Sequence, residues 1–97
     1  MSDFKNIVNN ITEKEYFHIF YDYSELRILN KEIQNYFKNK YSKKVNIINI
    51  NGIINLATLK KLFIFANNKK DNELIYLVNK YINEIYEKVI NKKYKNI

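Results

Sequence analysis

An apolar stripe at helical spacing runs through the last third of this chain for about five turns. Its members lie three or four positions apart, as on one face of an α-helix: Leu74, Leu77, Val78, Tyr81, Ile82, Ile85 and Val89. Asp71 stands just before the stripe, where a carboxylate caps the first turn of a helix. The sequence therefore predicts a long amphipathic helix that begins after Asp71.

The upstream sequence predicts further helices. Thr12 and Glu15 have the spacing of a capping box, so we expect a helix through the aromatic residues that follow. A strand is the alternative there, because residues 16–21 have high β propensity. Apolar residues also recur at helical spacing in three other segments, 4–11, 24–41 and 56–66.

The helical pattern is interrupted between residues 45 and 55. Residues 45–50 alternate β-branched side chains with Asn, and Asn51-Gly52 follows them. Asn-Gly between β-branched residues is typical of a two-residue hairpin turn, which needs positive φ at both positions. We predict a hairpin of residues 45–50 with 53–55, and an irregular loop with an Asn-Gly turn is the alternative. The predicted fold is mainly α, within the α+β class, with four to five helices and one central β-hairpin at about 45–55.

The chain is expected to form one domain. It has 97 residues and no repeat or linker, so residues 1–97 are predicted to be a single compact domain with a frayed C-terminus. No stretch approaches the roughly 20 apolar residues of a membrane span. The N-terminus also lacks the basic and apolar regions of a secretory signal. We expect a soluble intracellular protein of the host cytoplasm, or of an organelle matrix if it is organelle-encoded, with no membrane partner.

The composition is biased toward three residue types. Asn, Ile and Lys number 17, 16 and 16 among the 97 residues, and Arg occurs once. These residues have A/T-rich codons, so the bias indicates an A/T-rich genome, such as that of a phage, a large DNA virus or an organelle. Lysine content by itself is therefore weak evidence for nucleic-acid binding.

The placement of the charge is more informative than the total of +7. Residues 1–36 hold four basic and six acidic side chains, whereas residues 37–97 hold thirteen basic and four acidic ones. Codon bias raises lysine everywhere and does not explain this asymmetry. Lysines cluster at 38–44 and 92–95, and two smaller pairs, Lys60-Lys61 and Lys69-Lys70, lie in or next to the fourth predicted helix.

Lysines with interleaved Tyr and Asn are typical of surfaces that bind nucleic acid without sequence preference. We therefore expect a small accessory protein that binds nucleic acid or a nucleoprotein complex. Its candidate contacts are Lys38, Lys40, Tyr41, Lys43, Lys44, Lys92, Lys93, Tyr94 and Lys95. An ordinary solvated lysine surface is the alternative. A helix that leads through a basic stretch into an Asn-Gly hairpin also resembles a winged helix, but the near absence of Arg and the short turn at Tyr23-Ser24 argue against that interpretation.

A second functional hypothesis is a protein-binding module. Tyr16, Tyr21 and Tyr23 are the candidate interface residues of an aromatic face. Such a module would suit a phage or viral inhibitor of a host or defence factor. Pairing of two copies through surplus apolar surface on the last helix is a third possibility.

The sequence lacks the residues of common catalytic sites. There is no Cys, and the single histidine, His18, lies in the aromatic segment, where a packed or half-exposed ring is the usual role. One histidine cannot anchor a zinc site, and one glycine cannot build a phosphate-binding loop. We therefore expect no enzyme activity, no cofactor and no metal.

Overall fold

The computed structural model describes residues 11–41 and 53–94. Within these ranges the chain forms four helices: α2 (Glu13–Asp22), α3 (Ser24–Tyr41), α4 (Leu56–Lys69) and α5 (Asn72–Tyr94). The described part is therefore helical throughout apart from short connections.

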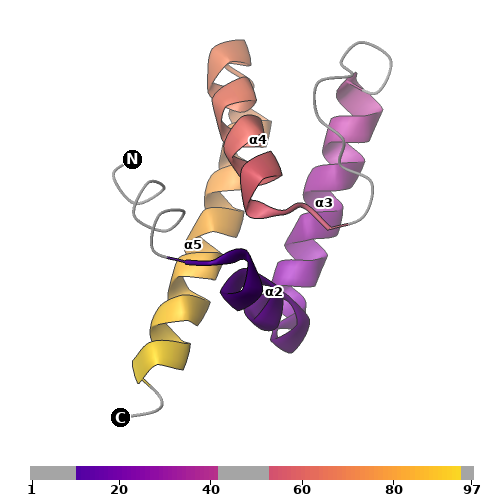
Figure 1. Ribbon diagram of the computed structural model, residues 1–97. Helices are drawn as coiled ribbons and strands as arrows, with labels where there is room; N and C mark the ends of the chain where they lie inside the picture. Colours follow the sequence, from indigo (N-terminus) through magenta and orange to yellow (C-terminus); the bar gives the residue numbers. More distant parts are fainter. Residues whose placement is uncertain (1–10, 42–52, 95–97) are drawn as a thin grey trace.

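The two longest helices, α3 and α5, pack against each other and form the frame of the molecule. Figure 1 shows α4 lying along the upper half of α5 and the short α2 crossing the lower half of the pair. The C-terminal ends of α3 and α4 and the first turn of α5 therefore lie at the same end of the molecule. The α2–α3 corner and the last turns of α5 lie at the other end.

Local capping explains where three of the helices begin. The Thr12 hydroxyl accepts from Glu15 N at 3.1 Å and the Glu15 carboxylate accepts from Thr12 N at 3.0 Å, which confirms the predicted capping box. Asn55 caps α4 by accepting from Thr58 N at 2.8 Å. Asp71 accepts from Leu74 N at 3.2 Å, as predicted for the N-cap of the last helix. These side chains satisfy N–H groups that have no partner within the helix.

Two charged side chains secure helix ends from a distance. The Arg27 guanidinium donates from α3 to the carbonyls of Phe20 and Tyr21, at 3.0 and 2.5 Å, and so satisfies acceptors at the C-terminal end of α2. Glu13 of α2 accepts from Leu56 N at 3.0 Å, where a carboxylate also suits the positive end of the α4 dipole. Together they tie α2 to α3 and to α4.

The core contains a connected set of polar side chains. Tyr16 and Tyr81 are fully buried, and the Tyr16 hydroxyl donates to the carbonyl of Ile54. The single Tyr16 proton is thereby used, so Tyr81 donates to the Tyr16 oxygen, and the Asn30 amide donates to Tyr81 at 3.2 Å. These bonds join α2, α3, α5 and the segment that leads into α4. Burial raises the pKa of both tyrosines, which keeps them neutral.

The prediction of a central hairpin, and with it the α+β class, is wrong. No residue in the described ranges forms a strand. Ile54 is a core residue whose carbonyl accepts from Tyr16, and Asn55 caps α4, so this segment leads into a helix. The β-branched residues here reflect burial and not strand pairing. The other predicted strand, residues 45–50, lies outside the described residues. So does the helix predicted at 4–11, except for Ile11, which is buried.

The Tyr16→Phe variant tests the buried hydrogen bonds. It keeps the ring but leaves the Ile54 carbonyl without its donor, so we expect the free energy of unfolding to fall by about 1–3 kcal/mol. Urea denaturation measures the change. Tyr21→Phe is the matched control, because Tyr21 is 62% exposed and its loss of a hydroxyl should cost less than about 0.5 kcal/mol. Equal stability of the two variants would contradict this account.

Lys70 ends α4 in the left-handed region, with φ 54° and ψ 37°, where glycine is the favoured residue. Lys70→Gly should therefore stabilise the protein by roughly 0.5–1 kcal/mol. Lys69→Gly removes the same charge inside the helix and should destabilise it by about 1 kcal/mol. Thermal unfolding followed by circular dichroism measures the change in melting temperature of each variant. A rise for Lys70→Gly and a fall for Lys69→Gly are expected, and changes of the same sign would contradict the prediction.

Candidate nucleic-acid interface

Asp71 lies between α4 and α5 and is only 7% exposed. Its carboxylate accepts from the Tyr36 hydroxyl at 2.7 and 2.9 Å and from the Tyr41 hydroxyl at 2.6 Å. It also accepts from Leu74 N at the start of α5. The last turns of α3 are thus bonded to the first turn of α5 through one buried carboxylate.

Lys40 supplies the positive charge of the cluster that it forms with Asp71, Tyr36 and Tyr41. Its ammonium lies 3.1 Å from the Asp71 carboxylate and donates to the Tyr36 oxygen at 3.1 Å. It also lies 5.6 and 5.7 Å from the ring centres of Tyr36 and Tyr41, within the range of cation–π attraction. Lys40 is therefore engaged within the protein, although 51% of its side chain is exposed.

These contacts change the titration of every member. Burial opposes ionisation of Asp71, but the hydrogen bonds from Tyr41, Tyr36, Leu74 N and Lys40 outweigh it and hold the pKa of the carboxyl below its usual value. Burial and the bond to Asp71 raise the pKa of Tyr41 to about 12. The bonds to Tyr36 and Asp71 raise the pKa of Lys40. At neutral pH the cluster thus holds one anion, one cation and two neutral phenols.

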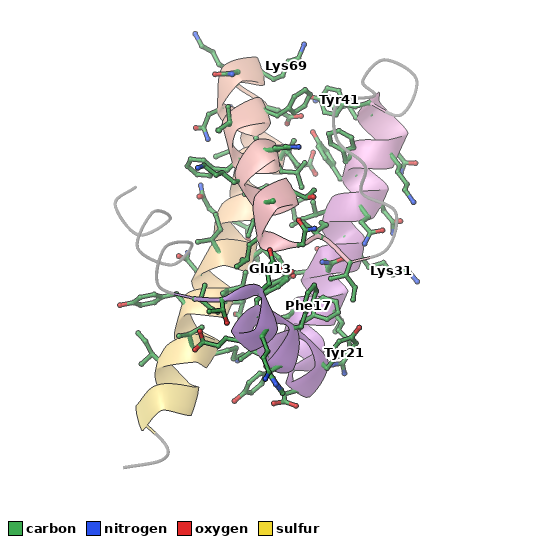
Figure 2. The ribbon with its side chains drawn as sticks, viewed as in Figure 1. Glu13, Phe17, Tyr21, Lys31, Tyr41 and Lys69 are labelled. Atoms are coloured by element: carbon green, nitrogen blue, oxygen red, sulfur yellow. The ribbon has the colours of Figure 1, made fainter. Side chains whose placement is uncertain are left out.

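Two phenylalanine rings pack against the Tyr41 ring of the cluster. The Tyr41 ring packs edge-on against Phe65 of α4 with centroids 4.9 Å apart, and Phe37 contacts both rings. The Lys69 ammonium lies 5.8 Å from the Phe65 ring centre. Figure 2 shows Tyr41 and Lys69 at the same end of the molecule, each on its own helix.

Four lysines gather at this end, and we call them the basic end: Lys38 and Lys40 from the last turn of α3, and Lys69 and Lys70 from the end of α4. Lys38, Lys69 and Lys70 are exposed. The first turn of α5 adds one exposed acid, Glu73. By contrast, Lys88 near the other end is matched by carboxylates, Glu25 at 3.1 Å and Glu84 at 3.5 Å.

The structure brings together only some of the predicted nucleic-acid contacts. Lys38, Lys40 and Tyr41 belong to the basic end or to the cluster beneath it, whereas Lys43, Lys44 and Lys95 lie outside the described residues. Lys92, Lys93 and Tyr94 belong to the last turn of α5, about 30 Å from its first turn at helical rise. The two predicted lysine clusters therefore do not form one surface.

The predicted aromatic interface is also divided. Tyr16 is a core residue and cannot contact a partner, and Tyr23 is half-buried beneath the Lys88 ammonium, 5.0 Å from its ring centre. Tyr21 alone is exposed, beside an open depression of about 410 Å³ on the outer face of α2. Lys14, Phe17, His18 and Asp22 complete its lining, and Figure 2 shows Phe17 and Tyr21 on the same helix, away from the basic end.

Sequence reasoning identified Asp71 as a helix cap but missed its partners on α3. The four-residue spacing of Tyr36 and Lys40 places these two side chains on one face of a helix, which is a local signal for part of the cluster. Nothing in that spacing indicates that Asp71, 30 residues after Tyr41, lies opposite.

Comparison with known proteins identifies no relative: no family model, curated protein or solved structure matches the chain. In the described ranges, no helix is long and apolar enough to cross a membrane. The same residues contain no group of three or more His, Asp or Glu side chains placed to hold a metal ion.

Asp71 should make the protein sensitive to acid. Because its pKa is lower in the folded than in the unfolded chain, folding favours the carboxylate. This stabilisation is complete above the unfolded value of about 4 and is lost as the pH falls through the folded value. We expect Asp71→Asn to lower the free energy of unfolding at pH 7 by on the order of 1 kcal/mol, and the gap to wild type to close in acid.

Urea denaturation at a series of pH values measures this gap. Glu73→Gln is the control, since it removes a carboxylate of the same helix turn that is exposed. A gap between Asp71→Asn and wild type that does not depend on pH would contradict the assignment.

Proposed function

We propose that this protein is a non-enzymatic accessory protein that binds nucleic acid, alone or within a nucleoprotein complex, through its basic end. The observation that carries the proposal is the convergence of exposed lysines from two helices, Lys38 of α3 with Lys69 and Lys70 of α4, at one end of the molecule. Lysines on separate elements that share a surface suit the repeated phosphates of a nucleic-acid strand.

The electrostatics of the site support this proposal. Three of the four lysines are exposed without a carboxylate partner among the ion pairs found in the described residues, whereas Lys40 is paired with the buried Asp71. Lys43 and Lys44 follow α3 by two and three residues in the sequence and lie outside the described residues. An intracellular location is part of the proposal, since nucleic acid is found there.

The salt dependence of binding tests the proposal. A labelled oligonucleotide longer than the roughly 4–16 nucleotides covered by small single-strand-binding domains is titrated by fluorescence anisotropy, alongside its duplex. We expect log K to fall linearly with log salt. The slope should change by about 0.7 for single strands, or 0.9 for duplex, for each phosphate contact removed.

Charge-matched variants locate the surface. Lys69→Gln with Lys70→Gln should reduce the slope by about two contacts. Lys14→Gln with Lys31→Gln removes the same charge from exposed positions on α2 and the middle of α3 and should leave the slope unchanged. If both double variants bind as wild type does, or if wild type does not bind at low salt, the proposal fails.

A protein-binding role has one specific observation in its favour, the exposed aromatic face of α2. A second copy of the chain is a partner that can be tested directly. Concentration-dependent amide shifts around Tyr21 would support self-association there, and Tyr21→Ala should abolish them. Tyr76→Ala is the matched control, because Tyr76 is also 62% exposed but lies on α5.

A further inference from the structure

We infer that Asp71 acts as an internal competitor for nucleic acid, holding Lys40 in an ion pair and so limiting the affinity of the basic end. The inference rests on the proposed function and adds an effect on binding to the structural role of Asp71 at the start of α5. It follows from the positions of the two charges and from their unequal exposure.

Lys40 is exposed enough to reach a phosphate, whereas the Asp71 carboxylate is buried and held by hydrogen bonds. Half of the Lys40 side chain is exposed, but only 4% of the Asp71 side chain is. Tyr36, Tyr41 and Leu74 N hold the carboxylate in place with hydrogen bonds that do not involve Lys40. A phosphate that binds Lys40 must therefore draw the ammonium away from a fixed carboxylate.

This exchange has an electrostatic cost. Lys40 is the only cation that forms an ion pair with Asp71 among the described residues, so its departure leaves a buried carboxylate without an opposite charge. Because of this cost, a phosphate contact with Lys40 adds little to the free energy of binding. In the wild-type chain Lys40 should therefore contribute almost nothing to the salt slope, although its charge counts fully in the total.

Asp71→Asn removes the competing charge and keeps the cap. Asparagine is as good an N-cap as aspartate, and its amide oxygen can still accept from Leu74 N. We expect tighter oligonucleotide binding and a slope larger by about one contact. The ratio of the Asp71→Asn binding constant to the wild-type binding constant should then be about threefold larger at roughly 50 mM than at 200 mM salt.

A general gain in positive charge would also tighten binding, so the control must match it. Glu73→Gln removes an exposed carboxylate from the same helix turn and should give a smaller gain without the added contact. Lys40→Gln separates the two effects further. It should leave the slope unchanged in the wild-type background and lower it by about 0.7–0.9 in the Asp71→Asn background.

Four variants, each shown to be folded by circular dichroism at the temperature used, complete the test: Asp71→Asn, Glu73→Gln, Lys40→Gln, and Asp71→Asn with Lys40→Gln. If wild type binds but Asp71→Asn gains no more than Glu73→Gln, the competitor role is overturned and the proposed function stands. If Asp71→Asn binds and wild type does not, the competitor role is supported and the proposed function of the wild-type chain fails. If neither binds, both are wrong.

Discussion

The described fold depends on one pair of buried tyrosine hydroxyls. A phenol that is taken out of water has to find hydrogen-bond partners within the protein, or its burial costs free energy. Tyr16 and Tyr81 satisfy each other, and the Ile54 carbonyl and the Asn30 amide complete the set. Because these groups come from α2, α3, α5 and the segment that leads into α4, a shift of any one of these elements would leave a buried polar group unpaired. The apolar stripes alone would allow several helix registers, and these bonds favour one of them.

The second constraint, at the basic end, concerns charge. Asp71 accepts hydrogen bonds from Tyr36 and Tyr41 and forms an ion pair with Lys40, and it caps α5 with the same carboxylate. One side chain thus starts a helix, fixes the end of another and neutralises a lysine. Of the four lysines that form the basic end, the other three are in none of the ion pairs found among the described residues. Net charge alone would overstate what this surface offers to a polyanion.

Sequence reasoning recovered what local interactions determine. Helical spacing and the caps at Thr12 and Asp71 act over three or four residues, and they predicted the four helices of the described residues. Sequence reasoning failed at residues 53–55, where buried β-branched residues give the sequence pattern of a strand. Ile53 and Ile54 read as strand residues, but Ile54 is part of a helical core and Asn55 is a cap. Asn55, directly before the apolar stripe that begins at Leu56, was the local signal for that cap.

The candidate site was predictable only in part. Lys38, Lys40 and Tyr41 were identified from their clustering along the chain. The burial of Tyr16, by contrast, depends on partners 38 and 65 residues away. The pairing of Lys40 with Asp71 likewise depends on how α3 meets α5. A single sequence carries no pattern for such contacts, because periodicity shows which face is buried and not which residue lies opposite.

The central claim is that nucleic acid binds at the basic end. Its most direct test is a titration of the ¹⁵N-labelled protein with the oligonucleotide, followed by amide chemical shifts. The account predicts that the shifts are confined to the ends of α3 and α4 and the first turn of α5, and that α2 around Tyr21 is unaffected. Shifts that centre on α2, or no shifts at low salt, would contradict it.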